Sequence, residues 1–252
     1  MVRCVAALIG AALVNGFILA SACAGDAATP DIIGFSKDGR YFAFEEYGTR
    51  DASIHPYSTI FVLDLDTGKS VPGAPFAVEH DKEGPEDAAR AETRKQAEPL
   101  LARLGIGEKP TRQVMHEDAR LFDPPTPDQA YATMAAEVTN LSIGDALPGG
   151  DVTVDVLSRT ITDAACAARG RDKLKSFSLV RTLPENNRNN EIVYVDEATG
   201  QERGCSQSNG LNALFVYRPA NARPRLVALV SYWPHSWEEP DRRYLAIPVP
   251  LP

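Results

Sequence analysis

The sequence predicts a mainly β, α+β fold: an antiparallel β sandwich or a partial propeller-like sheet with a flanking helical segment. Three observations lead to this class. Two turn–strand units lie near the start of the chain, one charged and alanine-rich stretch follows them, and short β-rich runs fill the second half. Alternation of apolar and polar residues with a period of two is typical of half-buried strands.

The first strand is predicted at 40–47, "RYFAFEEY", where Phe42 and Phe44 point to one face. Asp38 and Gly39 precede it with turn chemistry, because glycine adopts a positive φ without steric cost. The run "STIFVLDLD" (58–66) predicts the next strand. These two units resemble part of a propeller blade, but a propeller needs at least about four blades of four strands. The following helical stretch occupies the part of the chain where further blades would begin, which argues against a complete propeller.

A helical insertion is predicted at about 83–106. Pro85 followed by two acidic residues suits a helix start, and Gly105 suits its end. Pro99 removes a backbone donor inside this stretch and predicts a kink or two short helices. We interpret the charges of the stretch as a solvated helix face.

Strands dominate the second half of the chain. The residues 219–224, "PANARP", read as the tip of a hairpin, and 184–190, "PENNRNN", as an exposed loop. A capping box at 126–129 favours a helix there, and the alternative is that the residues that follow pair as a strand. Strands are predicted at 151–157, 176–183, 191–197, 212–219, 225–233 and 243–251.

Residues 1–24 are predicted to be a secretory signal peptide. Arg3 supplies a positive charge, an apolar run at 5–22 follows, and Ala22-Cys23-Ala24 matches the small-residue cleavage pattern. The alternative is a lipoprotein anchored at Cys23, although Leu19 lies one place too early for a good lipobox. No other stretch is long and apolar enough to span a bilayer. The mature chain, 25–252, is therefore expected to be one β-rich domain, periplasmic or secreted, with no transmembrane segment.

Charge and cysteine content agree with export. The formal net charge of −8 argues against nucleic-acid binding, which needs a basic face. Removal of the leader leaves Cys166 and Cys205, and an even number of cysteines in an oxidising compartment predicts a disulfide. Closing this loop of about 40 residues stabilises the fold by about 4 kcal/mol in the chain-entropy model. The alternative is two unpaired buried thiols.

Several of these segments resemble a family of bacterial predicted secreted proteins catalogued as domain of unknown function 2259. The similarity runs through these segments: Gly34-Phe35-Ser36, 38–46, Pro56-Tyr57-Ser58, Val71-Pro72-Gly73, Pro75-Phe76, Arg203-Gly204-Cys205 and 240–246. The sequence departs from the family pattern at 236–239, and at Ala52 and Ile54, where glycines are expected. The resemblance implies export and a β core, and it brings no assigned chemistry.

The best enzymatic candidates are two carboxylates at the end of the first strand. Glu45 and Glu46 lie near a loop that carries Asp51 and His55. A carboxylate at a β-rim near a histidine can act as a general acid or base if burial raises its pKa. The simpler interpretation is a solvent-facing pair balanced by arginines.

The best binding candidates lie in the loop "SYWPHSWEEPDRRY": Trp233, His235, Trp237, Arg242 and Arg243. Exposed aromatic residues beside arginines contribute affinity at binding surfaces. The same residues can instead fold back on their own sheet, with arginine stacked on tryptophan.

No metal or cofactor site is predicted. The four histidines are isolated in sequence, and no H-E-x-x-H motif is present. Asp64 and Asp66 begin like a calcium loop, but the remaining ligands are absent. The stretch "GFSKDG" does not match a nucleophile elbow, because its second glycine is one residue late.

Three functions follow from these observations. The first is a secreted or periplasmic non-enzymatic binding module of the cell envelope, with an envelope protein or glycan as partner. The second is a periplasmic hydrolase that uses the carboxylate and histidine residues at the β-rim. The third is a structural protein that docks through its helix, which requires an exposed apolar stripe through Leu100, Leu101 and Leu104.

Overall fold

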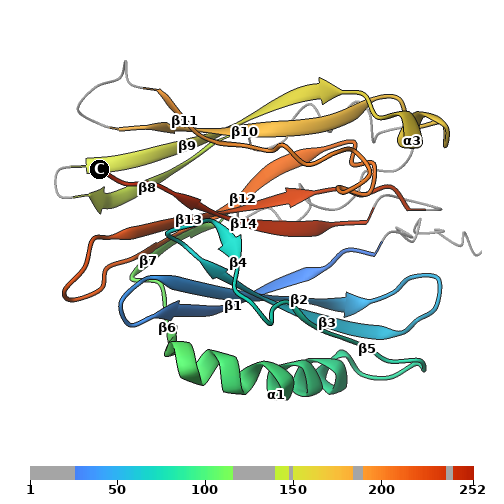
Figure 1. The fold of residues 1–252 in the computed structure, drawn as a ribbon, viewed down its shortest axis with the longest axis horizontal. Coiled ribbons are helices and arrows are strands. Elements are labelled where there is room, and N and C mark those ends of the chain that lie inside the picture. The colour runs from blue at the N-terminus through green and yellow to red at the C-terminus, as the bar shows by residue number, and fades with distance from the viewer. Residues whose placement is uncertain (1–25, 116–139, 148–149, 184–189, 237–240) are drawn as a thin grey trace, which may run out of the picture.

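A computed structural model describes residues 26–115, 140–147, 150–183, 190–236 and 241–252 of the chain. Three antiparallel sheets lie one above another, and the long helix α1 covers the outer face of the first sheet (Figure 1). The described fold is therefore a layered β sandwich with a flanking helix. This confirms the predicted fold class in its sandwich form.

The sheet beneath the helix, the helix-side sheet, has the order β4-β3-β2-β1-β6, with β5 paired to β3. Each β1–β2 and β2–β3 pair is antiparallel, as in a meander. Its strands are β1 (Thr29–Ser36), β2 (Tyr41–Thr49), β3 (Pro56–Asp64), β4 (Lys69–Ser70), β5 (Phe76–Glu79) and β6 (Ile106–Glu108).

The central sheet has the order β14-β13-β12-β7, and the far sheet has the order β11-β10-β9-β8. The central strands are β7 (Arg112–Met115), β12 (Asn209–Tyr217), β13 (Arg225–Tyr232) and β14 (Arg243–Val249). The far strands are β8 (Asn140–Leu147), β9 (Gly150–Ile161), β10 (Leu174–Thr182) and β11 (Glu191–Val195). The six strands predicted in the second half correspond to β9 to β14.

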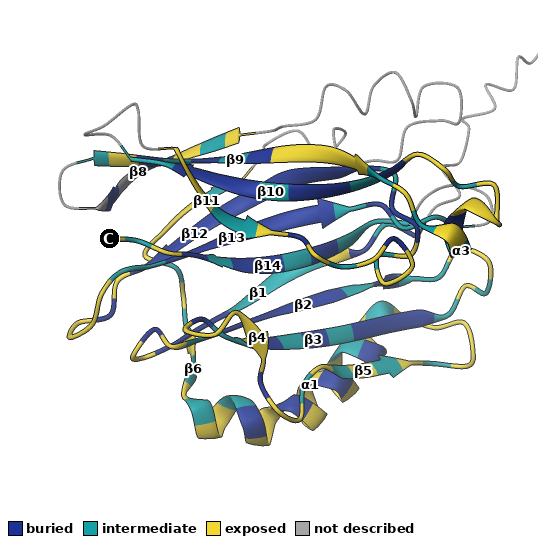
Figure 2. Cartoon of the chain, turned by 45° about the horizontal axis from the view of Figure 1, so that its top comes forward, coloured by how far each residue is buried: buried dark blue, intermediate teal, exposed yellow. Residues whose placement is uncertain are grey.

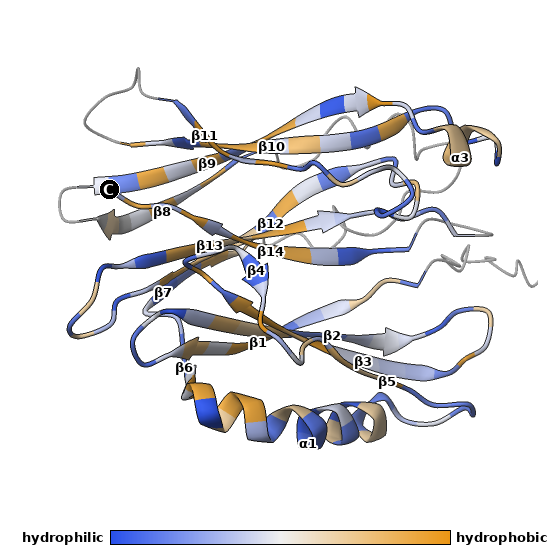
Figure 3. Ribbon diagram, in the orientation of Figure 1, coloured by the Kyte–Doolittle hydropathy of each residue, from blue (hydrophilic) through white to orange (hydrophobic). Residues whose placement is uncertain are grey.

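The two middle strands of the central sheet, β12 and β13, are buried on both of their faces. Every residue of β12 is buried, as Figure 2 shows. Phe215 packs against the helix-side sheet with Phe42, whereas Leu214 packs toward the far sheet with Phe177. Strands that are covered on two sides read as continuous apolar runs, which explains the unbroken "NALFVY" and "RLVALV". Figure 3 shows that the central strands are more hydrophobic than the loops that connect them.

The helix α1 (Glu86–Leu104) begins and ends close to the predicted residues. Pro85 occupies the N-cap, and Gly105 ends the helix in the left-handed conformation with φ 62°. The helix continues through Pro99 and is not divided into two. Pro99 lies on the exposed face, where water can satisfy the carbonyl that loses its helical partner. Ala97 and Leu100 pack on Ile60 of the helix-side sheet.

The predicted disulfide is present between Cys166 and Cys205, with Cα atoms 5.7 Å apart. Cys166 belongs to the short helix α3 (Ala164–Ala167), and Cys205 follows the loop after β11. Leu174 packs against both cysteines and closes this end of the far sheet.

Strand β1 was not predicted, because Pro30 and Gly34 break its apolar pattern. Gly34 has φ 139°, and a Cβ atom there would lie 2.5 Å from the backbone oxygen of Glu108. The glycine therefore allows β6 to approach β1, which it pairs through Phe35. The capping box at 126–129 and most of the loop predicted at 184–190 lie outside the described residues.

Candidate functional site

The adjacent carboxylates Glu45 and Glu46 point to opposite faces of β2, since neighbouring residues of a strand alternate. Glu45 is fully buried beneath α1. Its carboxylate accepts hydrogen bonds from Ser58 Oγ (2.9 Å), Arg90 Nε (3.1 Å) and Arg94 Nη2 (2.7 Å). Asp31 bridges the same two guanidinium groups from the surface.

The Arg90 guanidinium also lies 3.7 Å from the centre of the Tyr47 ring. Stacking on an aromatic ring and pairing with a carboxylate fix its orientation. Each carboxylate oxygen of Glu45 is thus occupied by donors from this chain. This arrangement attaches α1 to the sheet and leaves no lone-pair direction of Glu45 pointing toward a ligand space.

Glu46 faces the central sheet and is 4% exposed. One of its oxygens accepts a short hydrogen bond from the backbone N–H of Tyr244 in β14. Burial raises the pKa of Glu46 to about 7, because the loss of solvation outweighs the opposite effect of the Tyr244 N–H and the Arg243 charge.

Glu46 lies beside an ion cluster centred on Asp26. The Asp26 carboxylate accepts hydrogen bonds from Arg50 (2.7 Å), Arg243 (2.6 Å) and the Tyr57 hydroxyl (2.8 Å). Burial and the Asp26 carboxylate raise the pKa of Tyr57, although Arg243 acts in the opposite direction. The cluster joins the start of the described chain to the turn after β2, to β3 and to β14.

The other enzymatic candidates do not join these carboxylates at a pocket. Asp51 is exposed in the turn after β2, and His55 is half-buried there. The backbone oxygen of His55 accepts a hydrogen bond from Arg50, which closes the turn. Neither residue lines the groove along β14 described below or the shallow groove between α1 and β1. A catalytic role for Glu45, Glu46, Asp51 and His55 stays a prediction.

The binding candidates of the C-terminal loop contact their own chain where they are described. Trp233 is 3% exposed, and its backbone N–H is bound by the Ser208 carbonyl. The His235 ring contacts Arg171 Nη2 at 2.5 Å, and burial together with this cation lowers the pKa of His235. Trp237 lies outside the described residues.

The two arginines of this loop are also bound within the chain. Arg242 donates to the Ala28 carbonyl, and Arg243 belongs to the Asp26 cluster. The geometry of the described residues agrees with the self-packing interpretation. A binding role for the loop remains untested.

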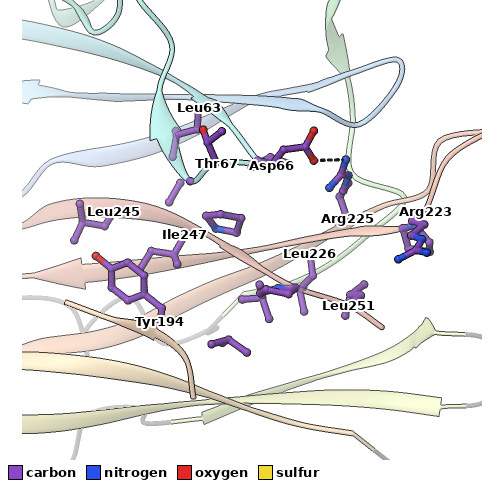
Figure 4. Close-up of a pocket in the computed structure, with 18 of the residues that line it drawn as sticks. Leu63, Asp66, Thr67, Tyr194, Arg223, Arg225, Leu226, Leu245, Ile247 and Leu251 are labelled. Atoms are coloured by element: carbon purple, nitrogen blue, oxygen red, sulfur yellow. Dashed lines mark ion pairs between the residues drawn. The ribbon is translucent and has the colours of Figure 1, made fainter. Parts of the chain in front are cut away.

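A groove of about 650 Å³ runs along β14, the edge strand of the central sheet. Figure 4 shows Leu63 and Thr67 on one side of it, Tyr194 on the other, and Leu245 and Ile247 between them. The groove therefore lies between an edge of the helix-side sheet and an edge of the far sheet, with the central edge strand as its floor. We call this site the β14 groove.

The backbone of β14 presents hydrogen-bonding groups to the β14 groove. Pro248 pairs with Val227 in β13, and proline cannot donate to that neighbour. The N and O atoms of Pro248 and of the alternate residues Ala246 and Tyr244 must therefore point away from β13. The hydrogen bond from Tyr244 N–H to Glu46 agrees with this assignment. In the described part of the chain, the outward N–H and C=O of Ala246 have no strand partner.

Three arginines line the β14 groove. Arg203 pairs with Asp196 at 2.8 Å, and Arg225 pairs with Asp66 at 2.7 Å (Figure 4). Arg223 is exposed at the tip of the β12–β13 hairpin, and no ion pair joins it to another described residue. Arg223 is thus the one of these three arginines that no described carboxylate neutralises, in a chain whose formal net charge is −8.

The sequence predicts the strand at 243–251 and the hairpin tip at 219–224 but not the β14 groove between them and their neighbours. One available signal was Pro248 inside an otherwise regular strand, because a proline in a strand indicates a sheet edge. Another was Arg223 between a hairpin proline and a strand. The walls come from segments far apart in sequence, so their meeting was not predictable from local patterns.

These features define a layered antiparallel β protein with an open central edge strand in a surface groove. The family model of a predicted secreted protein, domain of unknown function 2259, matches residues 43–250, and the chain belongs to that family. No curated protein and no solved structure matches the chain. Among the described residues, no helix has the length and apolar character that crossing a membrane requires.

Proposed function

We propose that this chain is a secreted, non-enzymatic binding module of the cell envelope and that its partner occupies the β14 groove. The observation that carries the proposal is the unpaired edge at Ala246, which lies between two apolar walls beside an uncommitted arginine. Ligand sites are concave and mostly apolar, with a few polar groups that fix orientation. The β14 groove has this composition.

The hydrolase alternative gains no support from the positions of its residues. The Glu45 carboxylate is occupied by two arginines and a serine, and Glu46 is bound to the backbone of β14. A general base must reach the proton that it abstracts. Neither carboxylate lines the β14 groove.

Docking through α1 also gains no support. Leu100 is 7% exposed, and Leu101 and Leu104 pack against the same apolar cluster beneath the helix. The three leucines therefore do not form an exposed stripe. The outward face of α1 is charged, as is usual for a solvated helix.

A photo-crosslinking residue tests the proposal directly. It is placed at Thr67, which is exposed on one wall of the β14 groove, and in a control protein at Gln96 on the outer face of α1. The secreted protein is irradiated in its native envelope fraction. We expect an adduct from Thr67 that disappears in the Arg223→Glu variant, and no such adduct from Gln96.

The proposal is wrong if Thr67 gives no adduct, or if the same adducts form from both positions. The adduct is identified by mass spectrometry, which also separates a protein partner from a glycan.

A further inference from the structure

We propose that the ligand of the β14 groove is an extended polypeptide segment that adds as a fifth strand to the central sheet. It lies antiparallel to β14, and it carries consecutive apolar residues preceded by an acidic residue. This inference rests on the proposed function and specifies the chemistry of its partner.

Hydrogen bonding favours a strand and fixes its register. Ala246 offers one N–H and one C=O toward the β14 groove. On one side of it, Glu46 already binds the Tyr244 N–H; on the other, Pro248 has no N–H, and Arg181 Nη1 donates to the Pro250 carbonyl. A peptide backbone can therefore exchange both hydrogen bonds with Ala246 alone. If the peptide shifted by two residues along β14, it would lie opposite Tyr244 or Pro248 and would find no free N–H donor. Strand addition to an exposed edge uses such main-chain bonds for affinity.

The two walls determine the side chains of the segment. Successive side chains of a strand point to opposite faces. Here one face meets Leu63 and Leu65 of the helix-side sheet, and the other meets Val193 and Tyr194 of the far sheet. Apolar side chains thus meet both faces of a bound strand, although Asp66, Thr67 and the arginines also line the groove. This favours a continuous apolar run over the alternation of a half-buried strand.

The charge of Arg223 determines where the acidic residue lies in the bound segment. Val249, at the end of β14, pairs with Leu226, so the exposed Arg223 lies near this end of the β14 groove. A strand antiparallel to β14 begins at that end. An acidic residue just before its apolar run therefore lies near Arg223. Complementary charges at a rim raise the association rate and fix the register.

A glycan fits the β14 groove less well than a polypeptide. A sugar ring packs its apolar face on an aromatic side chain, and Tyr194 is the one aromatic residue among those that line the groove. Tyr194 is itself half-buried, and its hydroxyl contacts Asp196. The polar groups available are backbone groups of an edge strand, which match a peptide.

The test uses a phage-displayed library of random dodecapeptides, selected on the mature protein. We expect enriched sequences with three or four consecutive apolar, mainly β-branched residues after Glu or Asp. Their affinity should fall at least tenfold in Arg223→Glu. It should stay within twofold in Arg169→Glu, which makes the same charge change at an exposed arginine beyond α3, outside the β14 groove.

Backbone methylation of the best peptide gives a second readout that does not depend on the folding of a variant. Methyl groups on the nitrogens that face β14 should weaken binding at least tenfold, because they prevent the hydrogen bond to Ala246. Methyl groups on the alternate nitrogens should leave the affinity within twofold.

Three results would overturn the strand-addition inference: no enrichment, enrichment without an apolar run, or equal effects of the two methylation patterns. If the Thr67 crosslink then identifies a glycan, the binding function stands and the ligand assignment is wrong. If Thr67 also gives no adduct, the proposed function is wrong as well.

Discussion

Two neighbouring carboxylates on β2 are both buried, yet their environments are opposite. Glu45 lies between two guanidinium groups and a hydroxyl group beneath α1, whereas Glu46 receives a backbone N–H from β14 in the core between two sheets. Burial raises the pKa of Glu46 to about 7. The two carboxylates are similarly buried and differ in the hydrogen-bond donors that surround them. The number and charge of a carboxylate's donors decide whether the ionised form is solvated.

We expect Glu45→Ala to lower the free energy of unfolding more than any of the other substitutions below. This substitution leaves Arg90, which is 18% exposed, without its buried partner and removes the polar attachment of α1 to β2. Breaking a buried ion pair costs about 4 kcal/mol in the free energy of unfolding. Urea denaturation followed by circular dichroism measures the loss. A loss below about 1 kcal/mol would show that Asp31 alone holds the arginines.

The pH dependence of Glu46 gives the next largest effect. Its folded pKa is raised from 4.5 to about 7, so the folded state binds more protons than the unfolded state between these values. Its contribution to stability is therefore complete below about pH 4.5 and is lost as the pH rises through 7. Over this range the loss is on the order of 3 kcal/mol.

Glu46→Gln isolates this contribution, because glutamine keeps the acceptor for Tyr244 N–H and carries no charge. We expect the variant to match the unmodified protein near pH 4.5 and to be more stable at pH 8. Differences between the two proteins remove the titration of all other groups. A difference that does not change with pH would contradict the assignment.

Ser58→Ala tests how much the hydroxyl donor of Glu45 contributes to the free energy of unfolding. Ser58 is fully buried and donates to Glu45 Oε1, whose other donor is Arg90. A hydrogen bond to a charged group contributes about 1.5 kcal/mol. The free energy of unfolding should fall by that amount, and Ser58→Thr serves as the control that keeps the donor.

The smallest effect is expected from Arg94→Lys. Arg94 is 49% exposed, and Arg90 continues to neutralise Glu45. The substitution keeps the charge and loses the two-pronged contact, so the expected loss is about 0.5 kcal/mol. A loss above about 2 kcal/mol in the free energy of unfolding would show that Arg94 stabilises Glu45 as much as Arg90 does, although Arg94 is more exposed.

The predictions from the sequence succeeded where chemistry and local pattern agree. Gly105 ends α1 because of its conformational freedom, and Cys166 pairs with Cys205, the two cysteines that lie outside the predicted leader. Alternation identified β2, and apolar runs identified the strands of the central sheet. Strand β1 was missed, because Gly34 is required by the approach of β6 and not by any local pattern.

The candidate site was less accessible from the sequence. The sequence proposed Glu45 and Glu46 as catalytic candidates or as a solvent-facing pair. Both are buried, and their partners come from α1 and β14, which lie far away in the chain. The β14 groove depends on which strand lies at the edge of the central sheet. That choice is a property of the sheet order, and the order is decided by long-range packing.

The burial of β12 on both faces has a consequence for how the protein is made. The helix-side sheet and the far sheet are complete by residue 195, but three of the four strands that lie between them span 209–249. A chain is synthesised from its amino end. The inner apolar faces of both outer sheets therefore remain uncovered until β12, β13 and β14 have been made. Closure of the stack is therefore a late event after synthesis, and the amide protons of β12 should exchange with solvent only when the whole molecule opens.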